Sequence, residues 1–344
     1  MVVIAHVVSH AIADTGDVAH MRRSQERKMR KRELSKLMGM LDRLTRTQRK
    51  ALAAELSAVE SKAASIEMIE SQALERPVCP HCGALRVVKN GSAHGLQRFK
   101  CCGCGKTFNA LTGTPLAGLH LRGKWLGQAT AMHEGLSLNQ VAARLNIARS
   151  TAFRWRHRFL ALPKTVQAQA LVGIAEADEA YFRKSAKGQR GLPRAARRRG
   201  SRAGKRGTPK DEFLSVLIAR DRSGGTANFI LESATGNAIG AVLKPVLPSD
   251  TVLCSDGGSA LAVAARALGV EHHAVNLSAG IRVDGAWHIQ NVNAFCSRLR
   301  DWMRRFKGVS SRYLDNYLGW FRALDRSPGA SPNPVSFLAM AIKV

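Results

Sequence analysis

Four cysteines occur as two C-x-x-C pairs, a spacing that is typical of metal-binding sites. Cys79 and Cys82 form the first pair, Cys101 and Cys104 form the second, and 18 residues separate the two pairs. Zn²⁺ prefers a tetrahedron of four thiolates, and two such pairs, each on a tight turn, supply that set. The alternative is a group of free buried cysteines without a metal. The paired spacing favours one structural Zn²⁺ ion in a zinc ribbon over residues 77–118.

The segment between the two pairs supports a ribbon. Its sequence, LRVVKNGSAHGLQRFK, alternates between apolar and polar residues around an Asn-Gly dipeptide, which predicts a β-hairpin. Cys102 lies inside the second pair, but its spacing to either partner is wrong for a ligand. A ribbon alone does not define a function, because ribbons can bind DNA, bind protein or only stabilise a small fold.

Two aspartates lie at the ends of predicted strands, where they could bind divalent cations together. Asp178 ends a strand-like run that begins LVGIAEA, and Asp256 ends the run TVLCSD. Carboxylates at the ends of neighbouring strands can hold two Mg²⁺ ions, which activate a water or a 3′-hydroxyl. A single aspartate there is more often a turn residue, but the matching positions of the pair favour a metal site. Glu176 and Glu179 flank Asp178, and the pattern leaves open which acid points into the site.

Other polar residues in the same region receive simpler interpretations. Asp221, in ARDRSGG, is predicted to start a hairpin turn. His272, His273 and His288 could position a phosphate, or they could be structural or solvated; the sequence leaves both roles open.

The stretch HIQNVNAFCSRLRDW, which begins at His288, predicts an amphipathic helix. Apolar residues recur at three- and four-residue steps as far as Phe306. Asn293 and Arg300 lie seven residues apart, almost two full turns, and therefore point the same way. The helix thus holds an amide and a cation in register on one side.

Residues 135–160 have the pattern of a helix, a short turn and a basic helix. Ser137 with Gln140 predicts a capping box, and Ser150 is predicted to cap the second helix. That helix carries four arginines, which are Arg149, Arg154, Arg156 and Arg158. The layout is that of a helix-turn-helix, whose second helix enters the major groove of DNA. The alternative is a helical hairpin with a solvated basic face; the neighbouring ribbon and the charge favour a DNA-binding domain over 119–165.

The composition indicates a polyanionic partner. Lys and Arg number 53 against 25 Asp and Glu, which gives a net charge of +28. Nucleic acid is favoured over a membrane surface, because no run of 18 apolar residues exists and the leading MVVIAHVVSHAIAD lacks the basic start of a signal peptide. Seven cysteines, four of them in paired spacing, favour metal binding in a reducing cytoplasm over disulfides.

A strongly basic insert over residues 183–210 follows Asp178. It holds 12 basic and no acidic residues among Gly, Pro, Ala and Ser, so we expect it to be flexible without a ligand. It should anchor DNA phosphates without reading sequence. The residues that we assign to this contact are Arg197, Arg198, Arg199, Lys205 and Arg206. The run GSRAGKRG lacks the spacing of a phosphate loop, which argues against ATP binding.

The remaining segments complete the predicted domain organisation. Leucine stripes at helical spacing predict a helical arm over residues 21–76, with TRTQRK as a break between two helices. Residues 1–20 form a leader that is unlike the rest of the chain. We expect it to be disordered, or to be included only because the start codon is misplaced upstream of Met21. Residues 166–325 form the predicted catalytic domain, and 326–344 a tail.

The order of elements in the catalytic domain predicts its fold. Three strands come first, then a strand, a helix and a strand, and finally the helix that begins at His288. This is the order of a ribonuclease-H-like mixed sheet with flanking helices. The chain is therefore predicted to be a multi-domain α/β protein.

Several of these motifs together resemble a family of bacterial insertion-sequence transposases. They are ADEAYF, LCSDGGSAL, RFKCCGCGKTFNALTGTPLAGL and the long stretch AVNLSAGIRVDGAWHIQNVNAFCSRLRDW. The family carries a zinc ribbon ahead of an acidic-triad, integrase-like domain, and the likeness runs in the same order from Cys79 to Trp320. In this subgroup the third triad position is Asn rather than Glu, and a Lys follows on the same helix.

Carried over residue by residue, the resemblance implies that Asp178, Asp256 and Asn293 are the catalytic and metal-binding residues. Arg300 stands at the Lys position, which keeps the charge but changes its geometry. The family also implies two Mg²⁺ (or Mn²⁺) ions per active site, hydrolysis at the ends of an element, and strand transfer into a target.

The implied partners are double-stranded DNA, both terminal repeats and target, and further copies of the chain in a homo-oligomer on that DNA. Two functions stay open. The chain is an active strand transferase, or it is a regulatory or vestigial DNA-binding protein that has lost activity. Retention of both aspartates and the asparagine favours the first.

Overall fold

The computed structural model describes residues 29–74, 77–192, 212–276, 279–325 and 334–342. The chain divides into two compact units, Met1–Ser57 and Ala58–Val344. The predicted leader, residues 1–20, lies outside the described residues. Within the described ranges, no helix is long and apolar enough to cross a membrane.

The first unit contains a short helix and the beginning of a long one. The elements are α2 (Lys31–Gly39), the 3-10 turn η2 (Leu41–Arg43) and α3 (Arg46–Leu74), which continues into the second unit. The Glu33 carboxylate accepts a hydrogen bond of 2.9 Å from the Arg30 backbone N–H and so caps α2. The break predicted at TRTQRK is shorter than expected: of these six residues only the first, Thr45, lies outside α3. Thr45 and Gln48 exchange capping hydrogen bonds, and α3 begins immediately after Thr45.

The cysteine-rich segment forms a three-stranded antiparallel sheet in the order β1-β2-β3. The strands are β1 (Val87–Ala93), β2 (Leu96–Cys101) and β3 (Thr107–Asn109). The predicted hairpin is confirmed, but its turn lies at His94-Gly95 and not at Asn90-Gly91. His94 and Gly95 both have positive φ, as a tight two-residue hairpin turn requires, whereas the Asn-Gly dipeptide falls in a register shift within β1.

Three helices follow the ribbon: α4 (Trp125–His133), α5 (Leu138–Leu145) and α6 (Arg149–Phe159), preceded by the 3-10 turn η3 (Arg122–Lys124). The predicted capping box of Ser137 and Gln140 is confirmed at the start of α5. The predicted cap at Ser150 is wrong. Helix α6 begins one residue earlier, with Ala148 at its N-cap and no side-chain cap. Asn146 adopts a left-handed conformation (φ 47°) and ends α5, which makes the turn between the two helices.

The part of the chain after the helix-turn-helix contains a five-stranded sheet in the order β6-β5-β4-β7-β8. Its strands are β4 (Ile174–Arg183), β5 (Phe213–Asp221), β6 (Thr226–Leu231), β7 (Val252–Ser255) and β8 (Glu271–Ala274). The first three strands pair antiparallel, and β7 and β8 then continue the sheet in parallel from β4. Three antiparallel strands extended by two parallel strands, with helices on both faces, confirm the predicted ribonuclease-H-like fold.

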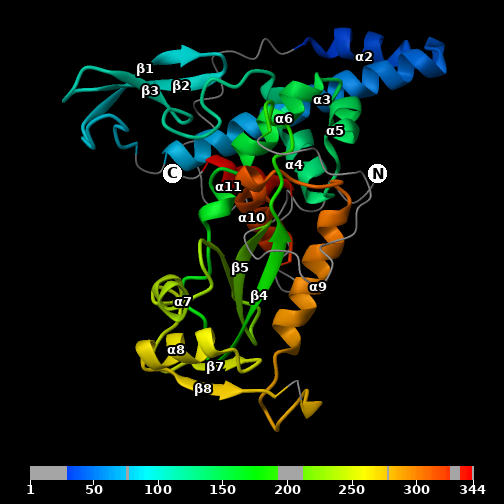
Figure 1. Ribbon diagram of the computed structural model, residues 1–344. Helices are drawn as coiled ribbons and strands as arrows, with labels where there is room; N and C mark the ends of the chain where they lie inside the picture. Colours follow the sequence, from blue (N-terminus) through cyan, green and yellow to red (C-terminus); the bar gives the residue numbers. More distant parts are fainter. Residues whose placement is uncertain (1–28, 75–76, 193–211, 277–278, 326–333, 343–344) are drawn as a thin grey trace. The chain divides into compact units, whose positions relative to one another are not determined.

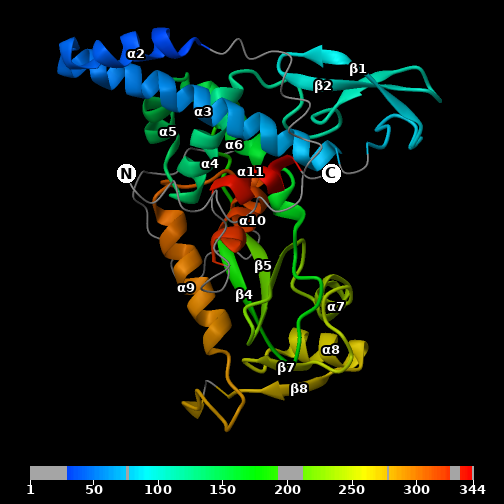
Figure 2. The same ribbon diagram turned by 180° about the vertical axis from the view of Figure 1, so that it is seen from behind.

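Each face of this sheet packs on its own helices, as Figures 1 and 2 show from opposite sides. The helices are α7 (Gly236–Leu243), α8 (Ser259–Leu268), α9 (Gln290–Arg304), α10 (Leu314–Leu324) and α11 (Pro334–Ile342), with the 3-10 turns η4 (Pro163–Thr165) and η7 (Ser311–Tyr313). Ala175 and Ala177 of β4 pack in one core with α7 and α8, whereas Ala180 packs in the other core with α9 and α10. The alternation along β4 therefore assigns each side chain to a face. Helix α7 was not predicted.

Helix α11 belongs to the core, although only a tail was predicted there. Phe337 and Leu338 are fully buried in the cluster that contains Trp125 and Met132 of α4. The Trp320 indole N–H of α10 donates to the Met132 carbonyl at 3.0 Å. Helices α4 and α6 of the helix-turn-helix thus share one hydrophobic core with the C-terminal helices, whereas α5 packs on α4 and α6 through a smaller cluster around Val141.

Candidate active site

The parallel pairing of β4 and β7 brings Asp178 and Asp256 together. Glu176 of β4 lies opposite Cys254 of β7, two residues before Asp178 and Asp256. The charge of Asp256 acts on Asp178, so the two carboxylates lie near each other where β7 ends. Strand β4 runs on to Arg183, so Asp178 lies inside it rather than at its end, at the point where β7 stops.

Backbone groups hold one oxygen of each aspartate. Asp178 Oδ1 accepts the N–H of Glu179 at 2.8 Å, and Asp256 Oδ1 accepts the N–H of Gly258 at 3.0 Å. The other oxygen of each carboxylate has no hydrogen-bond partner among the described residues. Each aspartate therefore keeps an oxygen that can bind a cation.

Burial raises the pKa of Asp178, and the nearby charge of Asp256 raises it further. The backbone N–H of Glu179 and the charge of Arg300 act in the opposite direction. Burial also raises the pKa of Glu179, together with the charges of the two aspartates. Three carboxylates and one guanidinium thus lie close enough to influence one another. Such a concentration of negative charge is typical of a site that is completed by a cation.

Helix α9 presents one side to this cluster. Cys296 lies one turn from both Asn293 and Arg300, so all three point the same way from the helix. Burial and the charge of Asp178 raise the pKa of the Cys296 thiol to about 11, and Arg300 opposes the shift. The electrostatic contacts therefore place Asp178 beside this side of α9. Asn293 and Arg300 are exposed, and in the described part of the chain neither makes a hydrogen bond to an aspartate.

Glu176 has a different role from Asp178, which the sequence could not reveal. Its buried carboxylate accepts the backbone N–H of Asn291 at 2.7 Å, the N–H of Val292 at 3.0 Å and the Asn291 side-chain amide at 2.7 Å. It also pairs with Arg222 at 2.9 Å and lies 3.2 Å from His288. Glu176 therefore anchors the first turn of α9, where negative charge is stabilising, and is not available to a metal.

The other polar residues of this region are structural. Asp221 accepts the N–H of Gly225 at 2.8 Å and the Ser223 hydroxyl at 2.7 Å, which confirms the predicted hairpin turn. His272 lies 2.8 Å from the Ser255 hydroxyl.

His273, the neighbouring histidine, stacks on an indole. Its ring and that of Trp287 lie 3.8 Å apart, and the Glu271 carboxylate lies 2.7 Å from its Nε2. None of the three histidines contacts the aspartate pair through an interaction within the described residues.

The four predicted cysteines form a cluster whose sulfur atoms lie within 4.8 Å of one another. The Cys79 and Cys104 sulfurs are 3.7 Å apart, and those of Cys82 and Cys101 are 3.6 Å apart. A Zn–S distance of about 2.3 Å gives a tetrahedron with edges of about 3.8 Å, so the cluster has the size of a zinc site. Cys102 is exposed and lies outside the cluster.

Backbone groups favour the thiolate form of one cysteine of this cluster, Cys101. The N–H groups of Cys104 and Gly103 approach Cys101 Sγ at 3.4 and 3.3 Å, and they lower the pKa of that thiol to about 6 although burial opposes the shift. A thiolate is the form that binds a metal.

The four arginines of α6 do not share one environment. Arg149, Arg154 and Arg158 are exposed, and Arg158 donates to the Ala117 carbonyl at 2.7 Å. Arg156 is 1% exposed, and its guanidinium donates to the Leu136 carbonyl at 2.6 Å. The assignment of Arg156 to DNA contact is corrected: it is a packing residue between the helix-turn-helix and α10. The assigned residues Arg197, Arg198, Arg199, Lys205 and Arg206 lie outside the described residues.

Comparison with known proteins agrees with this geometry. The sequence pattern of the ISXO2-like transposase domain matches residues 170–322, and that of the homeodomain-like domain matches residues 125–162. The first range covers the five-stranded sheet with α7 to α10, and the second covers α4, α5 and α6. The two matches identify a transposase domain preceded by a homeodomain-like helix-turn-helix domain.

A curated relative extends the match beyond these two domains. An uncharacterized protein in transposable element ISH50 of Halobacterium salinarum is 30% identical over 257 residues, which cover 73% of this chain and 87% of that protein. The chain therefore belongs to the insertion-sequence transposases with an ISXO2-like transposase domain.

Two solved structures are also similar. The intasome of simian T-cell lymphotropic virus in complex with PP2A regulatory subunit B56 gamma has a TM-score of 0.27 and 12% identity, over 57% of this chain and 68% of that chain. A pre-cleavage Mos1 transpososome has a TM-score of 0.26 and 16% identity, over 63% of this chain and 73% of that chain. The family assignment rests on the sequence relatives.

Proposed function

We propose that this transposase cleaves the ends of an insertion sequence and transfers the new strand ends into target DNA, in a metal-dependent reaction. The observation that supports the proposal is the parallel pairing of β4 and β7, which lies two residues before Asp178 and Asp256, together with the effect of the Asp256 charge on Asp178. Helix α9 lies against the same face of the sheet and supplies an amide and a guanidinium. Two carboxylates, an amide and a cation suit a phosphodiester substrate.

The donor set fits hard divalent cations. Asp178, Asp256 and Asn293 would hold two Mg²⁺ or Mn²⁺ ions through oxygen atoms. Such ions, when bound, activate a water or hydroxyl nucleophile and stabilise the leaving oxygen. Arg300 would hold a phosphate oxygen, because its electrostatic contact with Asp178 sets it at the rim of the site. Glu176 would fix the position of α9 and so of both side chains.

The remaining parts of the chain would hold DNA. Arg149, Arg154 and Arg158 are the exposed arginines of α6 and would read the terminal repeats from the major groove. The basic insert would neutralise phosphates without reading sequence. The ribbon would hold one structural Zn²⁺ through its four clustered cysteines and assist binding of the ends. We propose that further copies of the chain assemble on the DNA.

The test is cleavage of a supercoiled plasmid that carries the element ends, with Mg²⁺, Mn²⁺ or EDTA. The parent protein should nick at the ends only with a divalent cation, and Asp178→Asn and Asp256→Asn should bind the ends but not cut them. Lys244→Gln, at an exposed position that ends α7 on the other face of the sheet, is the matched control and should cut like the parent. A specific footprint that is independent of Mg²⁺, without cleavage by the parent under any condition, would instead establish a DNA-binding protein without activity.

A further inference from the structure

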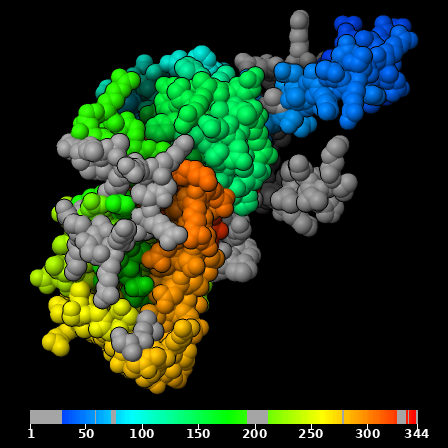
Figure 3. All heavy atoms as spheres, turned by 45° about the vertical axis from the view of Figure 1, so that its right-hand side comes forward, coloured from blue at the N-terminus to red at the C-terminus, as the bar shows by residue number. Residues whose placement is uncertain are grey.

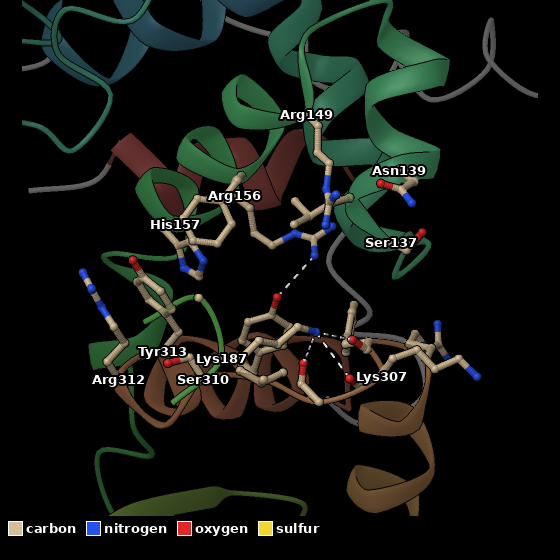
Figure 4. A pocket seen from close by; sticks show the side chains of 18 of the residues that line it. Ser137, Asn139, Arg149, Arg156, His157, Lys187, Lys307, Ser310, Arg312 and Tyr313 are labelled. Atoms are coloured by element: carbon tan, nitrogen blue, oxygen red, sulfur yellow. Dashed lines mark hydrogen bonds between the residues drawn. The ribbon is translucent and has the colours of Figure 1, made fainter. Parts of the chain in front are cut away.

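A groove of about 1610 Å³ lies between the helix-turn-helix and the segment that follows α9. Figure 4 shows Arg149, Arg156 and His157 on one side of it and Lys307 and Tyr313 on the other. Figure 3 shows the same region from outside, where α9 (orange) meets the helices of the helix-turn-helix (green). The groove is larger than the roughly 300–1,000 Å³ that encloses one drug-sized ligand, so it suits an extended ligand.

The lining of this groove is strongly basic. Its exposed cations are Arg149, Lys187, Arg305, Lys307 and Arg312. No Asp or Glu lines the groove, and none of these five residues forms an ion pair within the described part of the chain. The field of unpaired cations between two walls attracts a polyanion.

The same groove offers an aromatic surface. Phe153 of α6 is 37% exposed, and its ring meets His157 edge-on at 4.5 Å and Tyr313 edge-on at 5.4 Å. The rings of His157 and Tyr313 stack at 3.9 Å. Two rings thus support Phe153 and leave part of its own ring open.

Hydrogen bonds hold two cations of the groove, Arg156 and Lys187, in place. The Arg156 guanidinium donates to the Tyr317 hydroxyl at 3.3 Å, as a dashed line in Figure 4 shows. It also lies 5.0 Å from the ring of Trp320. Lys187 Nζ donates to the backbone carbonyl of Gly308 at 2.7 Å and to two more at 3.3 Å. The open ring, Arg156 and Lys187 are therefore held in place without a ligand, which reduces the cost of binding.

The chain itself cannot supply the polyanion. The segments outside the described residues are basic or nearly neutral, and the insert of 183–210 contains no acid at all. A duplex offers phosphates, but its base faces are covered by the neighbouring bases, so it has nothing to place on an open aromatic ring. An unpaired strand offers both, because its bases can leave the stack and lie on an aromatic side chain while its phosphates meet the cations.

We propose that this groove binds an unpaired DNA segment, with one base stacked on Phe153 and the adjacent phosphates held by Arg305, Lys307 and Arg312. This rests on the proposed function, in that DNA is the substrate. A strand separated from its complement at the element end would then lie between the helix that reads the duplex and the end of the helix that carries Asn293 and Arg300. The groove would select a frayed end over a closed duplex.

The test compares an unpaired oligonucleotide with a closed duplex of the same end sequence, both bound to the full-length protein. Phe153→Leu keeps an apolar side chain but removes the ring, so affinity for the unpaired strand should fall about tenfold, within the range measured for loss of one base-stacking contact. Duplex affinity should fall much less, because a closed duplex has no base to place on the ring. Phe153→Trp should restore strand binding, and Lys244→Gln at the end of α7 should behave like the parent for both ligands.

A second readout follows the stacked base directly. An oligonucleotide with 2-aminopurine at the unpaired position should lose fluorescence on binding to the parent and keep it with Phe153→Leu. Equal losses of strand and duplex affinity, or no loss of either, would overturn the proposal. If the parent bound the unpaired strand through Phe153 but showed no preference for element ends, the proposed function would fail while the strand-binding site stood.

Discussion

The proposed set of metal ligands contains two carboxylates, Asp178 and Asp256, where a set of three would carry more negative charge. Asn293 can offer an oxygen to a cation but brings no charge, so this set would neutralise two divalent ions less completely. We expect the phosphate of the DNA to supply part of the missing charge. We propose that Arg300, on the same side of α9, holds that phosphate or its neighbour.

This division of charge gives the first prediction. Asn293→Ala should reduce strand cleavage at least about 10–100-fold, the loss typical of even an outer partner of a metal site. Asn293→Asp should retain more activity than Asn293→Ala, because an oxygen ligand remains. Binding to the element ends, measured by mobility shift, should stay close to that of the parent for both variants. Cleavage by Asn293→Ala at the parent rate would remove α9 from the active site.

Glu176 leads to the second prediction. Its carboxylate satisfies the first backbone N–H groups of α9 and pairs with Arg222, so Glu176→Ala leaves buried donors and a cation without a partner. We expect the free energy of unfolding to fall by about 3–5 kcal/mol, as is typical when one partner of a buried pair is removed.

Glu176→Gln separates this role from metal binding, because the amide oxygen can still accept one of those N–H groups. Chemical denaturation should rank its stability between the parent and Glu176→Ala. An equal stability of all three proteins would contradict the anchoring role.

At the level of elements, the ribbon can be tested by metal content. Cys102→Ser should leave one Zn²⁺ per chain, because Cys102 lies outside the cluster of four sulfurs. Cys104→Ser should lose the metal, because three thiolates remain around the site. Atomic emission measured on the purified proteins distinguishes the two variants. Zinc that is lost from Cys102→Ser but kept in Cys104→Ser would overturn the ligand assignment.

The contact between α6 and η7 makes stability depend on pH. Burial, with Arg156 and Arg312 nearby, lowers the pKa of His157 from 6.5 to about 4. The Asn316 amide donates to its Nδ1 at 2.8 Å, so the neutral ring is the one that fits. Since the unfolded chain takes up the proton first, this contribution is complete above about pH 6.5 and is lost as the pH falls towards 4.

The expected measurement is a difference in melting temperature between pH 7 and pH 5. The parent should lose more than His157→Phe, which keeps an aromatic ring against Tyr313 but cannot be protonated. The rings of Tyr313 and Tyr317 also face His157. An identical pH dependence of the two proteins would show that His157 is not the group involved.

Much of the architecture could be predicted because each element has a local pattern. The strand-like runs, the spacing of the cysteines and the capping box at Ser137 are properties of neighbouring residues. The position of the hairpin turn was mistaken because the Asn-Gly dipeptide is the stronger local signal, yet cross-strand pairing moved the turn to His94-Gly95. Helix α7 lacks charged residues and begins with glycine, so its pattern is weak.

Some residues of the site could be predicted from the sequence and others could not, for a physical reason. Asp178 and Asp256 could be paired because the topology of the fold alone brings their strands together. The roles of Glu176 and Arg156 could not be predicted, since both depend on a contact between segments that are 115 and 161 residues apart. An acid in a strand and an arginine in a basic helix look alike in sequence whether they face solvent or a buried partner.

For the whole molecule, one contact joins recognition to catalysis. Gly135, between α4 and α5, has a positive φ of 68°, and a side chain there would meet Arg305 at 2.5 Å and Trp302 at 3.1 Å. The turn that precedes the helix-turn-helix pair therefore rests directly on the end of α9. Because α9 runs without interruption from the Glu176 anchor to this contact, we expect a fixed separation between the proposed reading helix and the proposed catalytic side chains.

Such a fixed separation would constrain the DNA sequence at the ends of the element. The number of base pairs between the recognised sequence and the cut bond would be set by the protein and not by the DNA. Inserting five base pairs there turns the bond by about half of a 10–10.5 base-pair helical turn, to the far side of the duplex. Binding should survive this insertion and cleavage should be lost. An insertion of one full helical turn returns the bond to the same side of the duplex but leaves it at the wrong distance. Natural ends mobilised by this transposase would then share one spacing, even where their sequences differ.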